Sequence, residues 1–141
     1  MERALINQRH GVTGTVICYW APVALYAGVI FYFSAQSHPE EHLPEFFIKQ
    51  ISDKLLHVME FALLAGLCYR AFRWAGGSFA ARRAVVLAIV TASGYGLTDE
   101  LHQWFVPLRE SSWMDWIADT IGALVGAAGW SRVANGTGDE R

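Results

Sequence analysis

The sequence predicts an all-α membrane protein, a bundle of four transmembrane helices in one domain. Hydrophobic residues make up 53% of the 141 residues and charged residues only 17%, whereas soluble domains are about 25% charged. Four long apolar runs follow one another along the chain, each near the ~20 residues that cross a bilayer core of about 30 Å. No basic tract of the kind that binds nucleic acid is present, so the lipid bilayer is the expected partner.

The apolar runs give the boundaries of the expected helices. The four spans are predicted at residues 12–33, 53–72, 84–105 and 113–133 of a single membrane domain, residues 1–141. Gly76 and Gly77 separate the second span from the third. In the fourth, Gly122 and Gly126 form a G-x-x-x-G pair, which permits close helix packing. The polar residues 135–141 are predicted to form a disordered tail.

Arginines set the expected orientation. Arg70, Arg73, Arg82 and Arg83 occur between the second and third spans with no acidic residue among them, and the N-terminal tail is also basic. The loop between the first two spans is acidic instead, with Glu40, Glu41 and Glu45. Positively charged loops stay in the cytoplasm, so both termini and the loop between the second and third spans are expected there. The first and third loops are then expected to face the outside.

Ionisable residues gather at the outer ends of three spans, in stripes with helical spacing. Asp53, His57 and Glu60 stand at i, i+4 and i+7, and Asp115 and Asp119 at i and i+4. A charge facing lipid costs about 2.5–3.5 kcal/mol on insertion scales, so the stripes are expected to turn inward and meet. The candidate binding residues are Asp53, His57, Glu60, Asp99, Glu100, Gln103, Arg109, Asp115 and Asp119.

The chemistry of this predicted site stays open between four interpretations. Histidine with carboxylates is an ordinary ligand set for a divalent cation. The same groups perform acid–base chemistry in enzymes, with an arginine binding a phosphate. The site could also bind a headgroup without reaction, or form a purely structural network. The candidate metal ligands are His57, Glu60 and Glu100. The candidate catalytic residues are His57, Asp99, Glu100 and Asp115.

At these residues the chain resembles the VanZ-like family of small bacterial membrane proteins, over roughly residues 31–127. FYFSAQS at residues 31–37 is similar to the end of that family's first span. DKLLHVMEFALLAGL at residues 53–67 resembles its D-K-x-x-H motif, and DELHQWFVPLR at residues 99–109 its D-E-x-x-Q-x-F-x-P-x-R motif. Asp115 and the G-x-x-x-G pair follow in the same order, and this order makes the combination specific.

The resemblance implies a multi-pass protein of the bacterial inner membrane and adds Lys54 to the candidate binding residues. Its namesake is linked to glycopeptide resistance, specifically to teicoplanin, and the family implies no settled reaction. Leu108 stands where the family often has Gly, and Asp119 where Asn is common. The family residues matched here are Asp53, Lys54, His57, Asp99, Glu100, Gln103, Pro107, Arg109 and Asp115.

We therefore expect a cell-envelope protein whose outward-facing polar pocket binds an amphiphile. Candidate amphiphiles are an anionic lipid or a polyprenyl-linked cell-wall precursor. One alternative is an enzyme that acts on such a lipid, as a phosphate-ester hydrolase or transferase. Another is a structural or partner-binding membrane subunit. A bound metal with an ordered water, held by His57 and the carboxylates, would favour the enzyme. A lipid-sized groove open to the outer leaflet without a metal would favour binding, and a closed, fully paired network would favour the structural subunit.

Overall fold

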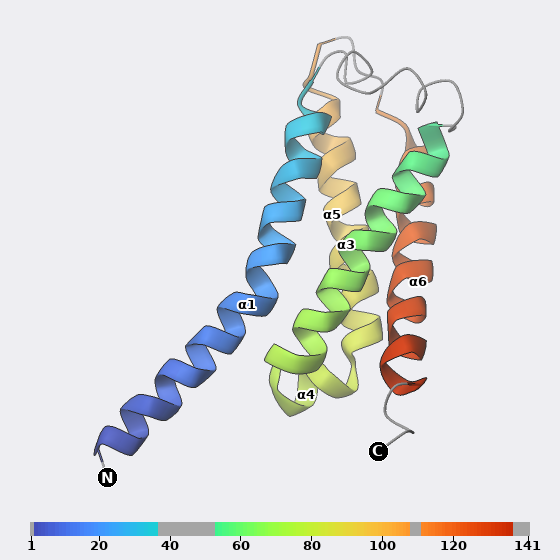
Figure 1. Ribbon diagram of the computed structural model, residues 1–141. Helices are drawn as coiled ribbons and strands as arrows, with labels where there is room; N and C mark the ends of the chain where they lie inside the picture. Colours follow the sequence, from blue (N-terminus) through green and yellow to red (C-terminus); the bar gives the residue numbers. More distant parts are fainter. Residues whose placement is uncertain (1, 37–52, 108–110, 137–141) are drawn as a thin grey trace.

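The computed structural model describes residues 2–36, 53–107 and 111–136, and every element in these segments is a helix (Figure 1). The all-α prediction is therefore confirmed. Four long helices lie lengthwise, and the short α4 joins two of them. The helices are α1 (Glu2–Ser34), α3 (Asp53–Ala75), α4 (Gly77–Arg82), α5 (Ala84–Gln103) and α6 (Trp113–Gly136).

The long helices alternate in direction along the chain. The beginning of α1, the end of α6 and α4 all lie at one end of the molecule, which we call the α4 end (Figure 1). The end of α1, the start of α3, the end of α5 and the start of α6 lie at the opposite end, the distal end. The first half of α1 leans away from the other helices toward the α4 end. Helices α3, α5 and α6 thus form the packed part of the molecule.

Of the described helices, three are long and apolar enough to cross a membrane. They are residues Thr13–Ser34 of α1, Lys54–Ala75 of α3 and the whole of α5. Helix α6 is as long but is not one of these three, and it carries the charged residues Asp115, Asp119 and Arg132. The chain is therefore a multi-pass membrane protein with at least three apolar spans.

Helix α3 is the centre of the packing, because it contacts every other described helix and touches α6 most extensively. A Cβ placed on Gly122 would collide with the backbone of Val58, and one on Gly126 with the backbone of Ala62. The G-x-x-x-G face of α6 therefore lies directly on the α3 backbone, as its small residues predict. Phe61 of α3 is fully buried beside this contact.

Helix boundaries differ in detail from those expected. Helix α1 begins at Glu2, well before the apolar run that starts at residue 12, because a helix that leaves the bilayer needs no apolar side chains. Helix α6 includes Asn135 and Gly136, the first two residues of the tail expected to be disordered, and residues 137–141 lie outside the described residues. Gly77, the first residue of α4, has a φ of 76°, a conformation that favours glycine.

Candidate functional site

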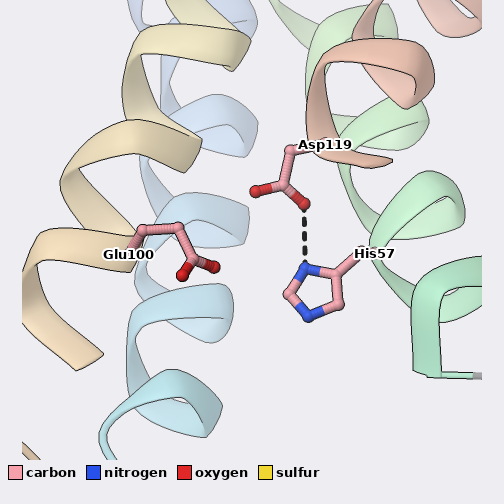
Figure 2. Close-up of side chains that lie close together, drawn as sticks. All are labelled: His57, Glu100 and Asp119. Atoms are coloured by element: carbon pink, nitrogen blue, oxygen red, sulfur yellow. Dashed lines mark hydrogen bonds and ion pairs between the residues drawn. The ribbon is translucent and has the colours of Figure 1, made fainter. Parts of the chain in front are cut away.

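Three helices bring one histidine and two carboxylates together near the distal end. His57 of α3 lies with its Nδ1 2.9 Å from Oδ1 of Asp119 on α6. The carboxylate of Glu100, from α5, points toward the same imidazole (Figure 2). One nitrogen or oxygen from each of the three residues lies within 4.8 Å of the other two. The side chain of Asp119 is 0% exposed and that of His57 only 12%, so this group is almost closed to the surroundings.

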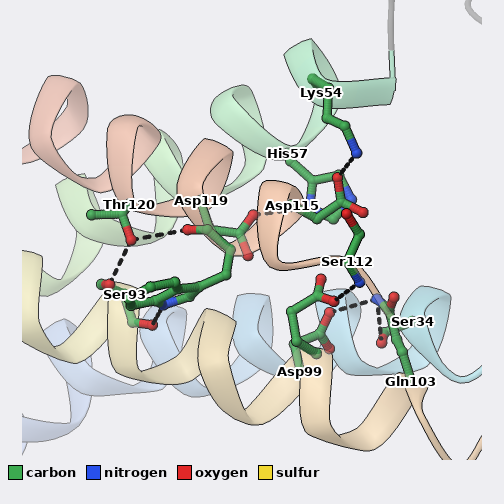
Figure 3. Close-up of polar contacts among 12 residues, drawn as sticks. Ser34, Lys54, His57, Ser93, Asp99, Gln103, Ser112, Asp115, Asp119 and Thr120 are labelled. Atoms are coloured by element: carbon green, nitrogen blue, oxygen red, sulfur yellow. Dashed lines mark hydrogen bonds and ion pairs between the residues drawn. The ribbon is translucent and has the colours of Figure 1, made fainter. Parts of the chain in front are cut away.

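A second pair of residues lies one turn nearer the distal end of the same two helices. Lys54 of α3 forms an ion pair with Asp115 of α6, and the Asp115 side chain is nearly buried (Figure 3). Lys54 precedes His57 by three residues and Asp115 precedes Asp119 by four, so each pair of neighbours shares a helix face. The two contacts together connect the first turns of α3 and α6.

Small residues make room for the buried carboxylate of Asp119. On α6 it lies one turn before Gly122, whose contact with the backbone at Val58 brings α6 against the part of α3 that carries His57. On α5, a Cβ on Gly96 would lie 2.6 Å from Asp119 Oδ2 and 3.1 Å from Cε1 of Phe61. Gly96 therefore leaves the space that the carboxylate fills, and Glu100 lies one turn further along the same helix.

Glu100 also holds the start of α6. Its Oε2 accepts hydrogen bonds from the backbone N–H of Ser112, at 2.7 Å, and from Oγ of Ser111, at 3.2 Å. The pattern S-x-x-D at Ser112–Asp115 is typical of a helix N-terminus, and Asp115 N–H donates to the Ser112 carbonyl at 2.8 Å. Sequence reasoning missed these serines, although the S-x-x-D pattern was a usable signal.

Asp99 and Gln103 connect α5 with α1 rather than with α6. Gln103 Nε2 donates to Asp99 Oδ2 at 2.9 Å and to Ser34 Oγ at 3.1 Å (Figure 3). About two turns nearer the α4 end, the Tyr95 hydroxyl of α5 donates to the Ala27 carbonyl of α1 at 2.6 Å. Ser34 was not among the predicted site residues. Its signal was a polar residue in the last turn of an otherwise apolar run.

The polar network leaves several acidic oxygens unsatisfied. Oδ1 of Asp99, Oε1 of Glu100 and Oδ2 of Asp119 are buried and have no hydrogen-bond partner among the described residues. A buried carboxylate oxygen without a partner is costly, so such groups usually face a proton, a water or a cation. The donor set of one imidazole and two carboxylates fits a divalent cation such as Zn²⁺ or Mn²⁺.

The structure separates the predicted site residues into groups. Asp119, rather than the predicted ligand Glu60, joins His57 and Glu100, while Glu60 is half-buried on α3, nearly one turn beyond His57. Asp53 is the first residue of α3, and Pro107 is exposed beyond the end of α5. Arg109, expected to cover the site as its phosphate-binding cation, lies outside the described residues, as does Leu108.

Comparison with known proteins returns one family. The family model described as VanZ/LLP1 matches residues 19–134, which is most of the chain. The match runs from the middle of α1 to near the end of α6 and includes all residues of the site described above. No curated protein and no solved structure matches the chain.

Proposed function

Because the chain belongs to the VanZ/LLP1 family, we propose that it is a cell-envelope protein of the bacterial inner membrane that binds an amphiphile at its distal end. The amphiphile is an anionic lipid or a lipid-linked cell-wall precursor, held through its phosphate. His57, Glu100 and Asp119 would hold a divalent cation, whose charge would attract this phosphate. We expected a bound cation to favour the enzyme, and catalysis is therefore the second candidate function below. The expected phenotype is tolerance of a glycopeptide antibiotic of the teicoplanin type, which rests on the family resemblance.

The proposed topology has four spans, with both termini in the cytoplasm and the distal end outside. Helix α6 is the fourth span because it lies beside α3 and α5 over their length (Figure 1). Its exposed Trp113 and Trp130 are about 25 Å apart along the helix, which suits two membrane interfaces. Arg82 and Arg132 lie at the α4 end, which favours the cytoplasm for that end.

The observation that carries the proposal is the meeting of His57 with two buried carboxylates, each of which has an unsatisfied oxygen. A structural network would gain most from complete pairing, yet Glu100 and Asp119 each retain a buried oxygen with no partner among the residues described. A cation between them and His57 would satisfy these oxygens. Exposed Trp104, Phe105 and Trp113 surround the same end and suit a headgroup environment.

A second candidate function is catalysis on the bound lipid, as a phosphate-ester hydrolase or transferase. The specific observation is the 2.9 Å contact between His57 Nδ1 and Asp119 Oδ1 beside Glu100. A carboxylate that orients an imidazole in this way is a common arrangement for a general base. In this version Glu100 and His57 move protons, while Asp99 and Asp115 remain in the surrounding network.

Mass spectrometry of copurified lipids and metals tests the proposal. Wild type should retain about one divalent ion per chain and a phosphate-bearing amphiphile at the distal end, and the His57→Ala, Glu100→Ala double variant should lose the ion and this amphiphile. Arg83→Gln, at the α4 end, is the control and should retain both. If the wild type and the double variant carried the same lipid and metal content, the binding and enzyme functions would be excluded and only a structural role would remain. Conversion of added lipid by the wild type alone would identify the enzyme.

A further inference from the structure

A polar pocket lies at the α4 end, remote from the distal site. It encloses about 310 Å³, near the lower limit of about 300 Å³ for small-molecule sites. Helices α3, α4, α5 and α6 all contribute to its walls. Its polar lining includes Arg73, Arg82, Ser131 and Asn135, and no Asp or Glu occurs among the described residues that line it. The pocket is therefore a site of positive charge shared by several helices.

The four arginines between positions 70 and 83 divide into two kinds. Arg70 lies over the rings of Tyr19 and Trp130, with its guanidinium carbon 5.7 Å and 5.6 Å from their centroids. Arg83 lies over the ring of Phe79 at 4.2 Å. Arg73 and Arg82 line the pocket instead, and neither forms an ion pair within the segments that the structure describes. The positive-inside rule explains the excess of arginine, but not why two of the arginines share a pocket.

We propose that this pocket binds the phosphate of an anionic phospholipid headgroup from the cytoplasmic leaflet. Two guanidinium groups match the geometry of phosphate oxygens, and the Asn135 amide supplies a further donor. Exposed Trp74 and Phe79 lie at the same end and are suited to the headgroup level of the bilayer. Basic pockets between helices on the cytoplasmic side are suited to anionic headgroups.

This inference rests on the proposed topology for the choice of leaflet, but not on the distal site. The residues of the pocket lie in the second half of α3, in α4, at the start of α5 and at the end of α6. His57, Glu100 and Asp119 lie toward the other ends of α3, α5 and α6. A negative result at one of the two proposed sites therefore does not contradict the proposal for the other.

Native mass spectrometry of the full chain with phosphatidylglycerol or phosphatidylcholine tests the proposal. Arg73→Gln with Arg82→Gln should weaken phosphatidylglycerol binding by on the order of 25-fold, at about fivefold per arginine. Arg70→Gln with Arg83→Gln removes the same charge from the same end and should change binding less than threefold. Equal losses in the two double variants would show general charge attraction and overturn the pocket. Unchanged binding in the first variant would overturn it as well.

Two further arms separate the remaining explanations. Asn135→Asp alters an exposed side chain without changing its size and places a carboxylate in the pocket. It should reduce phosphatidylglycerol binding at least fivefold with an unchanged melting temperature, and unchanged binding would contradict the proposal. Soluble glycerol phosphate at millimolar concentration should not displace the lipid; displacement would assign the pocket to a soluble anion. His57→Ala should leave this binding intact, whatever happens at the distal site.

Discussion

At the scale of single residues, the burial of the Asp119 carboxylate costs free energy. One of its oxygens contacts His57, and the other has no hydrogen-bond partner among the described residues. An unsatisfied buried polar group costs about 1–3 kcal/mol, and more when it is charged. The hydrogen at Gly96, in place of a side chain, gives this carboxylate its space. Such a costly arrangement is best explained by a function that needs the charge.

Substitution of this glycine tests the arrangement directly. Gly96→Ala should lower stability by about 1–3 kcal/mol, because its Cβ would lie 2.6 Å from Asp119 Oδ2. Gly94→Ala, on the same helix, meets nothing within 4 Å and should be neutral or stabilising by about 0.5–1 kcal/mol. Thermal unfolding of the purified protein measures both. Equal melting temperatures in the two variants would mean that Asp119 is not held against α5.

At the scale of the helices, the contact between α3 and α6 decides how the site forms. Gly122 and Gly126 lie against the α3 backbone, so α6 has little freedom to rotate about its axis. That fixed rotation directs Asp119 toward His57 and Asp115 toward Lys54. Two features of α6 therefore hold it against α3. Its small residues allow the two backbones to approach closely, and its polar stripe pairs with polar side chains of α3.

The same contact predicts a difference between two glycines of α6. Gly126→Ala should destabilise the bundle by about 1–3 kcal/mol, because the added methyl group meets the carbonyl of Ala62. Gly129→Ala, nearly one turn later on the same helix, meets nothing within 4 Å and is the control. The melting temperature and the yield after detergent extraction report the result. A Gly126→Ala protein as stable as wild type would show that this face of α6 looks toward lipid.

Sequence patterns predicted the helices and the meeting of His57 with Glu100, but not the third member of the group. Residues three apart on a helix differ by about 60° in direction, so the stripe of α3 could not show which of its polar residues face α6. That choice follows from the rotation of α3 and α6 against each other. Packing directs His57 toward Asp119 and leaves Glu60 outside the group.

Ser34 was not predicted as a site residue for a related reason. Nothing in the spacing of α1 shows that its last turn meets the last turn of α5, where Gln103 donates to the serine hydroxyl. The partner of a single polar residue depends on which helices are neighbours, and that depends on the whole packing. The G-x-x-x-G pair was easier to predict, because its small residues have one evident use.

At the scale of the whole molecule, the charges are divided between two ends. The arginines of α3, α4 and α6 lie toward the α4 end, and the buried carboxylates lie toward the distal end. This division is the basis of the proposed topology. In the proposed topology the two proposed sites lie in opposite leaflets, where each would meet a different population of lipids.

Cysteine labelling in cells tests the topology. In a chain with Cys18→Ser and Cys68→Ala, single cysteines at positions 78 and 135 should react only with reagents that enter the cytoplasm. A cysteine at position 41, in the segment that joins α1 to α3, should react from outside. Labelling of position 78 from outside would reverse the orientation. Labelling of position 135 from outside, with position 78 inside, would show that α6 does not cross the membrane.

The most direct test of the central claim is manganese binding to the chelator-washed protein, followed by electron paramagnetic resonance. Wild type should bind about one Mn²⁺ per chain with coupling to an imidazole nitrogen. Asp119→Asn, of nearly the same size, should weaken binding by at least 10–100-fold, the loss typical of supporting groups around a metal. His57→Ala should abolish the nitrogen coupling, while Lys54→Gln should leave the affinity undiminished. Equal binding in wild type, His57→Ala and Asp119→Asn, or no binding in wild type, would contradict a cation site at these three residues.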